Sequence, residues 1–160
     1  MPSIPERVKQ IIAKEQVLII GTSFKEITNV SPRTAFHIDP DGSIYWLEIF
    51  KHKTFRNLHK NEWCSISIFD KKELTGYQLK GKARLLTDRK KKHRMCKIII
   101  DRLTRLHKQK ILKQSKNQRI NIVKFTAKLV YSLNPNEISD TPIVIDDDSH
   151  SLRVANLHRS

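Results

Sequence analysis

The segment from Leu74 to Thr87 constrains the fold of this chain more than any other, because its apolar and polar residues alternate throughout. Apolar or small residues fall on one side and polar or basic residues on the other: Tyr77, Leu79, Gly81, Ala83 and Leu85 against Gln78, Lys80, Lys82 and Arg84. A period of two is the pattern of a β-strand whose side chains alternate between two faces. The segment therefore predicts a strand with one face toward a core and the other toward solvent.

Further strands are predicted where β-branched or alternating residues gather, at 16–22, 29–38, 43–49, 63–69 and 119–133. In the last of these, the alternation of apolar and polar residues is interrupted between Ile122 and Val123, so that the inward-facing positions shift by one residue. This predicts a β-bulge. A short edge strand is expected within 141–146. No strand–helix–strand unit repeats and no glycine-rich loop follows a strand, so a doubly wound nucleotide fold is not expected. Sequential antiparallel strands favour a small closed barrel.

Three helices are expected beside these strands. One precedes the first strand, a short one covers 53–60, and a long basic one begins after Asp88. The apolar stripe of the long helix stops after His107, where it is expected to end or kink. The chain is long enough for a single domain with a real core, which we expect to span 1–146. The polar segment 147–160 is expected to be a flexible tail.

The charge of the chain is concentrated in one segment. Of a net charge of +15, the residues from Arg89 to Arg119 carry +12, with thirteen lysines and arginines and one acid, Asp101. Such a segment attracts nucleic acid, an anionic membrane or an acidic partner, and a solvated helix face is an equally good interpretation. The segment contains no aromatic residue to stack on bases, so a nucleic-acid contact would be made to phosphates.

Cysteine and histidine patterns exclude other classes of site. Cys64 and Cys96 lie 32 positions apart with no Cys or His at metal-ligand spacing beside them. Both are expected to be reduced packing residues, and the protein is expected to be cytoplasmic. The seven histidines form no His-x-x-x-His pair, so no metal site is predicted. No apolar run is long enough to span a membrane.

A candidate phosphate site lies between Ile44 and Asn61. There an apolar strand ends in a cationic turn and leads into a helix that opens with Lys53 and Thr54. A helix start presents unpaired N–H groups and the positive end of the helix dipole. Lys53 adds a charge and Thr54 a hydroxyl donor. A solvated basic turn is the alternative interpretation of the same residues.

Four segments in this order resemble the FMN-binding split-barrel superfamily, the pyridoxamine 5'-phosphate oxidase-like proteins. They are Val17–Thr22, Asn29–Pro32, the pair Asp41–Tyr45 and Lys53–Asn61, and Gly76–Gly81. The resemblance implies a six-stranded barrel that dimerises and holds FMN in clefts at the dimer interface. With the helices expected above, the fold class is mainly β: a six-stranded antiparallel split barrel with an N-terminal helix, a short helix and one long basic helix.

The resemblance also implies which residues bind the cofactor. In such proteins the Lys-Thr turn holds the FMN phosphate, the second strand lines the flavin, and the polar face of the fifth strand contributes one residue. The residues that match are Lys53, Thr54, Asn29, Ser31, Pro32, Arg33 and Gln78, with Arg56 as a further cation for the phosphate. Glu48 stands where oxidases of this group have a neutral polar residue, and His52 where they have an arginine.

Three functions stay open at this point. The first is an FMN-dependent oxidoreductase that acts on a small molecule, with no residue assigned a catalytic role. The second is a non-catalytic split barrel that uses the basic segment 89–119 to bind nucleic acid or an anionic partner. The third is a haem or flavin binder without turnover. A visible spectrum of the purified protein separates the first and third from the second.

Overall fold

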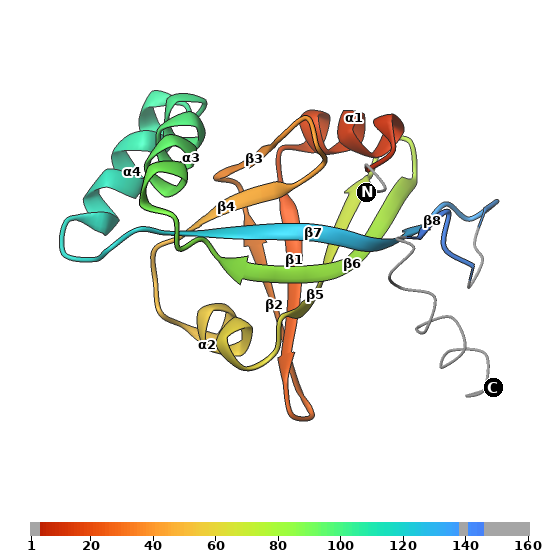
Figure 1. Cartoon of the computed structure of the whole chain (residues 1–160). Helices are drawn as coiled ribbons and strands as arrows, with labels where there is room; N and C mark the ends of the chain where they lie inside the picture. The colour runs from red at the N-terminus through yellow and green to blue at the C-terminus, as the bar shows by residue number, and fades with distance from the viewer. Residues whose placement is uncertain (1–3, 138–140, 146–160) are drawn as a thin grey trace.

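A single curled antiparallel sheet forms the body of the protein, with helices at its ends and side (Figure 1). The computed structural model describes residues 4–137 and 141–145. Its elements follow in the order α1 (Glu6–Glu15), β1 (Leu18–Phe24), β2 (Ile27–Arg33), β3 (Phe36–Ile38), β4 (Ile44–Glu48), α2 (Lys53–Lys60), β5 (Trp63–Asp70), β6 (Thr75–Leu85), α3 (Arg89–Asp101), α4 (Arg105–Ser115), β7 (Asn121–Ser132) and β8 (Val144–Ile145).

The strand order in the sheet is β2-β1-β5-β6-β7-β4-β3, and β8 pairs with β7 outside this path. β2 and β3 lie at the two ends of the order, yet only Thr34 and Ala35 separate them in the chain. The chain itself therefore bridges the open side of the curled sheet. The predicted count of six strands is wrong, because 29–38 is not one strand: its first part pairs with β1 and its last part with β4.

The strand predicted from the alternation between Leu74 and Thr87 is confirmed as β6. β6 pairs antiparallel with β5 on one side and β7 on the other, and its inward residues Tyr77, Leu79 and Ala83 are buried. The register between β6 and β7 shifts between Lys80 and Gly81, so the irregularity of β7 lies at Lys128.

The expected bulge at Ile122 and Val123 is wrong, because β7 keeps its register with β4 and β6 there. Both residues are fully buried, but in different cores. Val123 faces the interior of the curled sheet, and Ile122 faces a second core between the sheet and α3–α4. A strand covered on both faces loses its alternation, which the sequence pattern alone presents as a change of phase.

The prediction of a single long basic helix is also wrong. The chain turns at 102–104, and two helices result, with Asp88 capping α3 and Thr104 capping α4. Met95 and Ile99 of α3 and Ile111 of α4 all bury in the second core. A straight helix over 89–115 would extend about 40 Å and carry Ile111 away from that core. The break therefore lies before His107, where the packing requires it.

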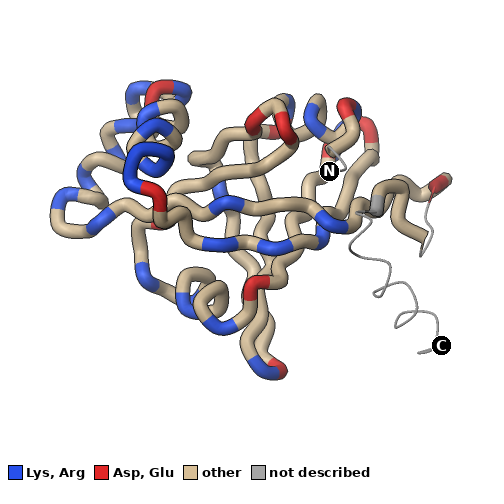
Figure 2. The backbone as a smooth tube through the Cα atoms, viewed as in Figure 1, with Lys and Arg blue, Asp and Glu red and all other residues tan. Residues whose placement is uncertain are grey.

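Figure 2 shows lysine and arginine gathered on α3, α4 and the connection to β7, with fewer on the rest of the chain. Among the residues that the structure describes, no helix has both the length and the apolar character needed to span a membrane. The segment 147–160, expected to be a tail, lies outside the described residues.

Candidate functional site

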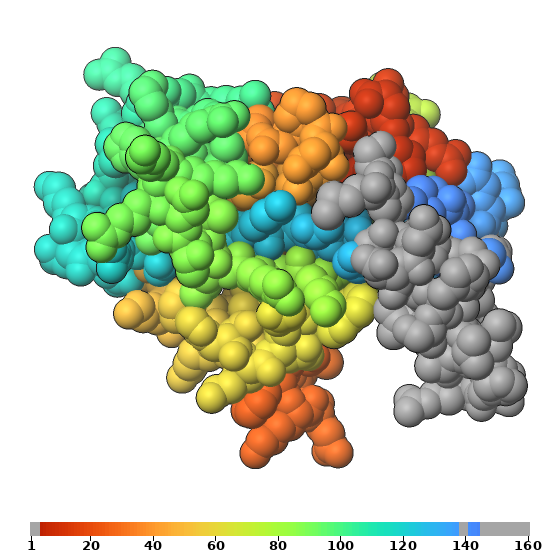
Figure 3. All heavy atoms as spheres, in the orientation of Figure 1, coloured from red at the N-terminus to blue at the C-terminus, as the bar shows by residue number. Residues whose placement is uncertain are grey.

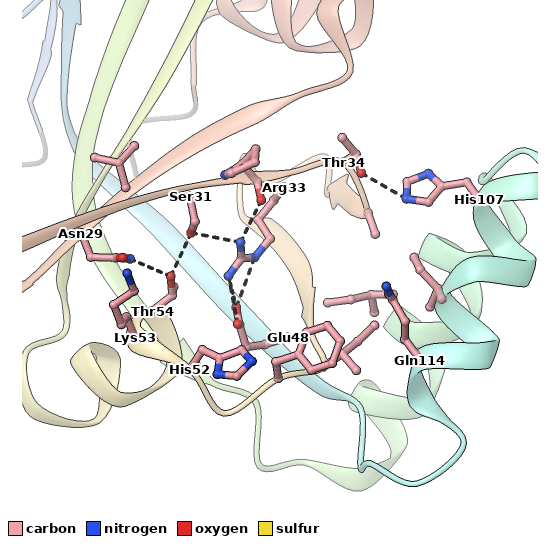
Figure 4. Close-up of a pocket in the computed structure, with 17 residues that line it drawn as sticks. Asn29, Ser31, Arg33, Thr34, Glu48, His52, Lys53, Thr54, His107 and Gln114 are labelled. Carbon is pink, nitrogen blue, oxygen red and sulfur yellow. Dashed lines mark hydrogen bonds and ion pairs between the residues drawn. The ribbon is translucent and has the colours of Figure 1, made fainter.

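A cavity of about 410 Å³ opens between β2, the connection from β4 to α2, and α4 (Figure 4). β2 forms one wall from Asn29 to Arg33, and the chain from Leu47 to Thr54 forms the facing wall. His107, Ile111 and Gln114 of α4 close one end. The site therefore joins three segments that are far apart in the sequence.

Six of the eight residues predicted to bind a cofactor line this cavity: Asn29, Ser31, Pro32, Arg33, Lys53 and Thr54. Arg56 is not among them; it is exposed on α2. Gln78 is not among them either, because it sits on β6 beside Ser67 of β5 and Tyr131 of β7. The structure thus brings together the strand and the helix start, and it places the remaining two residues elsewhere.

A chain of hydrogen bonds ties β2 to the start of α2. Asn29 donates from Nδ2 to Thr54 Oγ1 at 3.0 Å, and the hydroxyls of Ser31 and Thr54 are 2.9 Å apart. Arg33 donates from Nη1 to Ser31 Oγ at 3.0 Å. The alternation of a strand puts residues 29, 31 and 33 on one face, so they form a row along the cavity. Thr54 is buried, and its hydroxyl serves to hold α2 against β2.

Glu48 lies at the centre of the cavity wall as a buried carboxylate that Arg33 neutralises. Arg33 Nη2 lies 2.9 Å from Oε1 and 2.8 Å from Oε2, and its Nε lies 3.3 Å from Oε2. Trp46 adds a hydrogen bond from Nε1 to Oε2 at 3.1 Å. The side chains of Arg33 and Glu48 are 17% and 5% exposed, so the pair is shielded from water on most sides. Arg33 therefore gives the cavity little net positive charge, because its own charge is paired.

The uncompensated positive charge of the site comes from the start of α2. Lys53 is exposed at the first position of the helix, and no side chain caps that end. Its first turn contains no acidic residue. Figure 4 shows Lys53 and His52 at the edge of the cavity, below the row formed by Asn29 and Ser31. The backbone N–H groups at this end are available to an anion, and the helix dipole favours negative charge there.

The α4 wall is the part of the site that sequence reasoning missed. His107 shares a hydrogen bond with Thr34, with 3.2 Å between Nε2 and Oγ1. His107, Ile111 and Gln114 are spaced as one face of a helix. That spacing was visible in the sequence, but nothing in it showed that this face meets β2.

A second hollow of about 390 Å³ lies on the other side of β2, along β1, β5 and β6, and it shares Asn29 and Val30 with the first. Lys80 of β6 lines it. Val30 beside it is 67% exposed and Ile19 of β1 is 37% exposed. The two hollows therefore meet at Asn29 and Val30 of β2.

The structure also constrains metal and thiol chemistry. In the described part of the chain, no three His, Cys, Asp or Glu side chains come together to hold a metal ion. Burial raises the pKa of the Cys64 thiol to about 12, and it raises the pKa of Cys96 as well. Neither thiol has the lowered pKa that a nucleophilic cysteine needs.

A curled antiparallel sheet, with a strand row and an uncapped helix start facing one cavity, is the architecture of a split-barrel protein. The family model described as pyridoxamine 5'-phosphate oxidase matches residues 4–134. The chain therefore belongs to the pyridoxamine 5'-phosphate oxidase family, as its motifs predicted. No curated protein sequence matches the chain significantly.

Solved structures show the same fold. A protein from Clostridium acetobutylicum related to general stress protein 26 superposes with a TM-score of 0.64 at 16% identity, covering 91% of this chain and 99% of that one. HutZ, a heme storage protein from Vibrio cholerae, gives a TM-score of 0.61 at 16% identity, over 81% and 94%. HupZ of Group A Streptococcus gives 0.58 at 16% identity, over 82% and 95%.

Proposed function

We propose that the cavity binds FMN, with the phosphate at the start of α2 and the flavin extending along β2. The observation that carries this proposal is the uncapped amino end of α2, where Lys53 opens the helix at the edge of the cavity. Charge-assisted contacts at a helix start suit a phosphate dianion. When bound, the flavin would supply hydride or electron transfer to a small molecule, which is chemistry that belongs to the cofactor.

The residues around the start of α2 suit a phosphate, but their roles differ from those that the family resemblance implied. Lys53 and the first N–H groups of α2 would hold it, while Thr54 stays in its hydrogen bonds to Asn29 and Ser31. Arg33 would contribute hydrogen-bonding N–H groups more than charge, since Glu48 balances it. The buried carboxylate is thus paired and does not repel the ligand as an isolated charge would.

We also propose that the flavin lies at the interface of a homodimer. The support is the exposed apolar surface at Val30 and Ile19, beside the second hollow on the outer face of the sheet. Gln78 of β6 lines neither hollow of its own chain, and we propose that it contacts a flavin that is held mainly by the second copy. Because its two cysteines are unpaired, we further propose a reducing, cytoplasmic location.

Haem binding without turnover is the second candidate. The observation that favours it is the pair of imidazoles at the cavity, His52 and His107, either of which is a suitable ligand for iron. The structural likeness to HutZ, itself described as a heme storage protein, is in line with this candidate.

Titration of the purified protein with FMN, followed by flavin fluorescence, tests the first proposal. Lys53→Ala is expected to lower the affinity for FMN at least tenfold, about 1.4 kcal/mol, which is the contribution of one charge-assisted contact. Lys60→Ala is the matched control, because Lys60 is an exposed lysine in the last turn of the same helix. It should stay within about twofold of the parent. Equal affinity for Lys53→Ala and the parent would place the phosphate elsewhere.

A parallel titration with haem, read in the Soret band, decides between the candidates. FMN binding without a Soret shift favours the flavoprotein. A Soret shift that disappears in His107→Ala or His52→Ala, with no response to FMN, favours the haem binder.

A further inference from the structure

The helical hairpin formed by α3 and α4 is a strongly basic lobe beside the sheet (Figure 2). Most of its apolar residues point inward, where Met95, Ile99 and Ile111 pack against β4 and β7. Eleven of the thirteen lysines and arginines of the segment from Arg89 to Arg119 are therefore carried by a hairpin that is anchored through its other face. The lobe packs on the sheet through its apolar residues, and most of its lysines and arginines are exposed.

The exposed face of α3 is a cationic stripe. Lys90, Arg94 and Lys97 follow each other at helical spacing, and all three are exposed. In the space-filling view, the side chains of α3 (green) cover the side of this lobe that faces the viewer (Figure 3). Asp101 engages Lys97 at 2.7 Å and Lys108 at 3.5 Å. Within residues 4–137 and 141–145, no acid lies at ion-pair distance from Lys90 or Arg94.

The charge pattern runs against the stability of the helices that carry it. α3 begins with Arg89, Lys90 and Lys91, and neither α3 nor α4 has an acidic residue in its first turn. Cations at a helix start oppose the helix dipole, and like charges one turn apart repel. A solvated helix face selected only for folding would mix its charges. Asp88 at the cap of α3 offsets only part of this repulsion, and an anionic partner would offset more of it.

The composition of the lobe distinguishes between classes of partner. Leu106 and Leu112 are the exposed large apolar residues on α3 and α4, and at six positions apart they point to different sides of α4. A membrane-surface helix needs one continuous apolar face, with aromatic or leucine side chains that enter the lipid. A protein interface is built around aromatic or arginine anchors in desolvated pockets, whereas the arginines of α3 and α4 are exposed with no continuous apolar surface around them. Stacking on single strands needs aromatic residues. The segment from Arg89 to Arg119 holds no aromatic residue.

We propose that the exposed face of α3 binds double-stranded nucleic acid through its phosphates, without reading base sequence. Regularly spaced cations with no apolar anchor match the repeated charge of a duplex backbone. The binding is independent of the flavin, because Lys90, Arg94 and Lys97 are not among the residues that line the cavity.

Fluorescence anisotropy with labelled duplexes of about 20 base pairs, one DNA and one RNA, measures the affinity over a range of salt concentrations. The test variant is Lys90→Gln/Arg94→Gln/Lys97→Gln, since glutamine keeps helix propensity and removes the charge. The control is Lys60→Gln/Lys71→Gln/Lys72→Gln, which removes the same charge from exposed lysines elsewhere. Circular dichroism confirms that each variant is folded.

At about 100 mM salt, the α3 variant should lose at least tenfold in affinity, and the slope of log affinity against log salt should shrink by two to three units. The control should change by no more than about twofold. Equal losses in both variants would show that only net charge matters and would overturn the assignment of a face. No duplex binding by the parent, or stronger α3-dependent binding to phosphatidylserine vesicles, would overturn the proposal. The relative affinity for the two duplexes shows which nucleic acid is preferred.

Discussion

The ion pair between Arg33 and Glu48 makes a quantitative prediction about stability. Replacing Arg33 with methionine keeps most of the side-chain volume and removes the charge that balances a carboxylate only 5% exposed. Removing one partner of a buried pair costs about 3–5 kcal/mol, because the remaining charge is left unpaired. Since Arg33 itself is 17% exposed and water can reach the vacated position, we expect the lower end, about 3 kcal/mol.

A double-mutant cycle measured by urea unfolding tests the reasoning. Glu48→Gln alone should cost about 1.5 kcal/mol, because the amide oxygen still accepts the hydrogen bond from Trp46. The double variant, Arg33→Met/Glu48→Gln, buries no charge and should lose only about 2 kcal/mol, less than Arg33→Met alone. In a domain of this length, the Arg33→Met loss lowers Tm by roughly 6–12 °C. Additive losses in the double variant would refute the view that an unpaired carboxylate dominates.

Three further predictions concern the ligand, pH and thiol reactivity. Glu48→Gln should raise the affinity for FMN about tenfold in a fluorescence titration, because the charge of Arg33 then acts on the phosphate; weaker binding would contradict this. His37 is buried and receives a hydrogen bond from Arg102 on Nδ1, at 2.6 Å; burial, then the positive charge of Arg102, lowers its pKa below 6.5. The unfolded chain then binds a proton more readily, so stability from this group is fully present above pH 6.5 and is lost as pH falls from 6.5 through the lowered pKa of folded His37. His37→Gln should flatten this pH dependence in urea unfolding, and an unchanged slope would refute the prediction. Cys64, with its pKa raised to about 12, should resist iodoacetamide at pH 8 until the protein is unfolded, and fast labelling of the folded chain would show that it is accessible.

Local patterns in the sequence predicted the elements that depend on nearby residues. The alternation of β6, the cap at Asp88 and the helix opening at Lys53 all involve contacts within a few positions, and the structure contains each of them. The family motifs predicted the architecture for the same reason, since they mark strand ends and turns. The predicted strand boundaries were wrong where tertiary packing decides them, as at Thr34 and Ala35, where the chain bends between β2 and β3.

The residues of the cavity were predicted in part, because some of their contacts are local while those that join β2 and Thr34 to α2, β4 and α4 are not. The row Asn29, Ser31 and Arg33 follows from the period of a strand, and only the fold brings it to Thr54. Nothing in the sequence indicated that Glu48 engages Arg33, since the two lie on different strands.

The sequence by itself determined that this chain builds a mainly β barrel of a known family, with a cationic helix start and one intensely basic segment. Only the tertiary structure decided that the basic segment folds back as two helices, that α4 closes one end of the cavity with His107, and that Gln78 lies outside it. The physical reason is the distance along the chain over which each kind of interaction acts. Periodicity and capping act over one or two turns, whereas a cavity wall or an ion pair depends on which distant surfaces the buried core brings together.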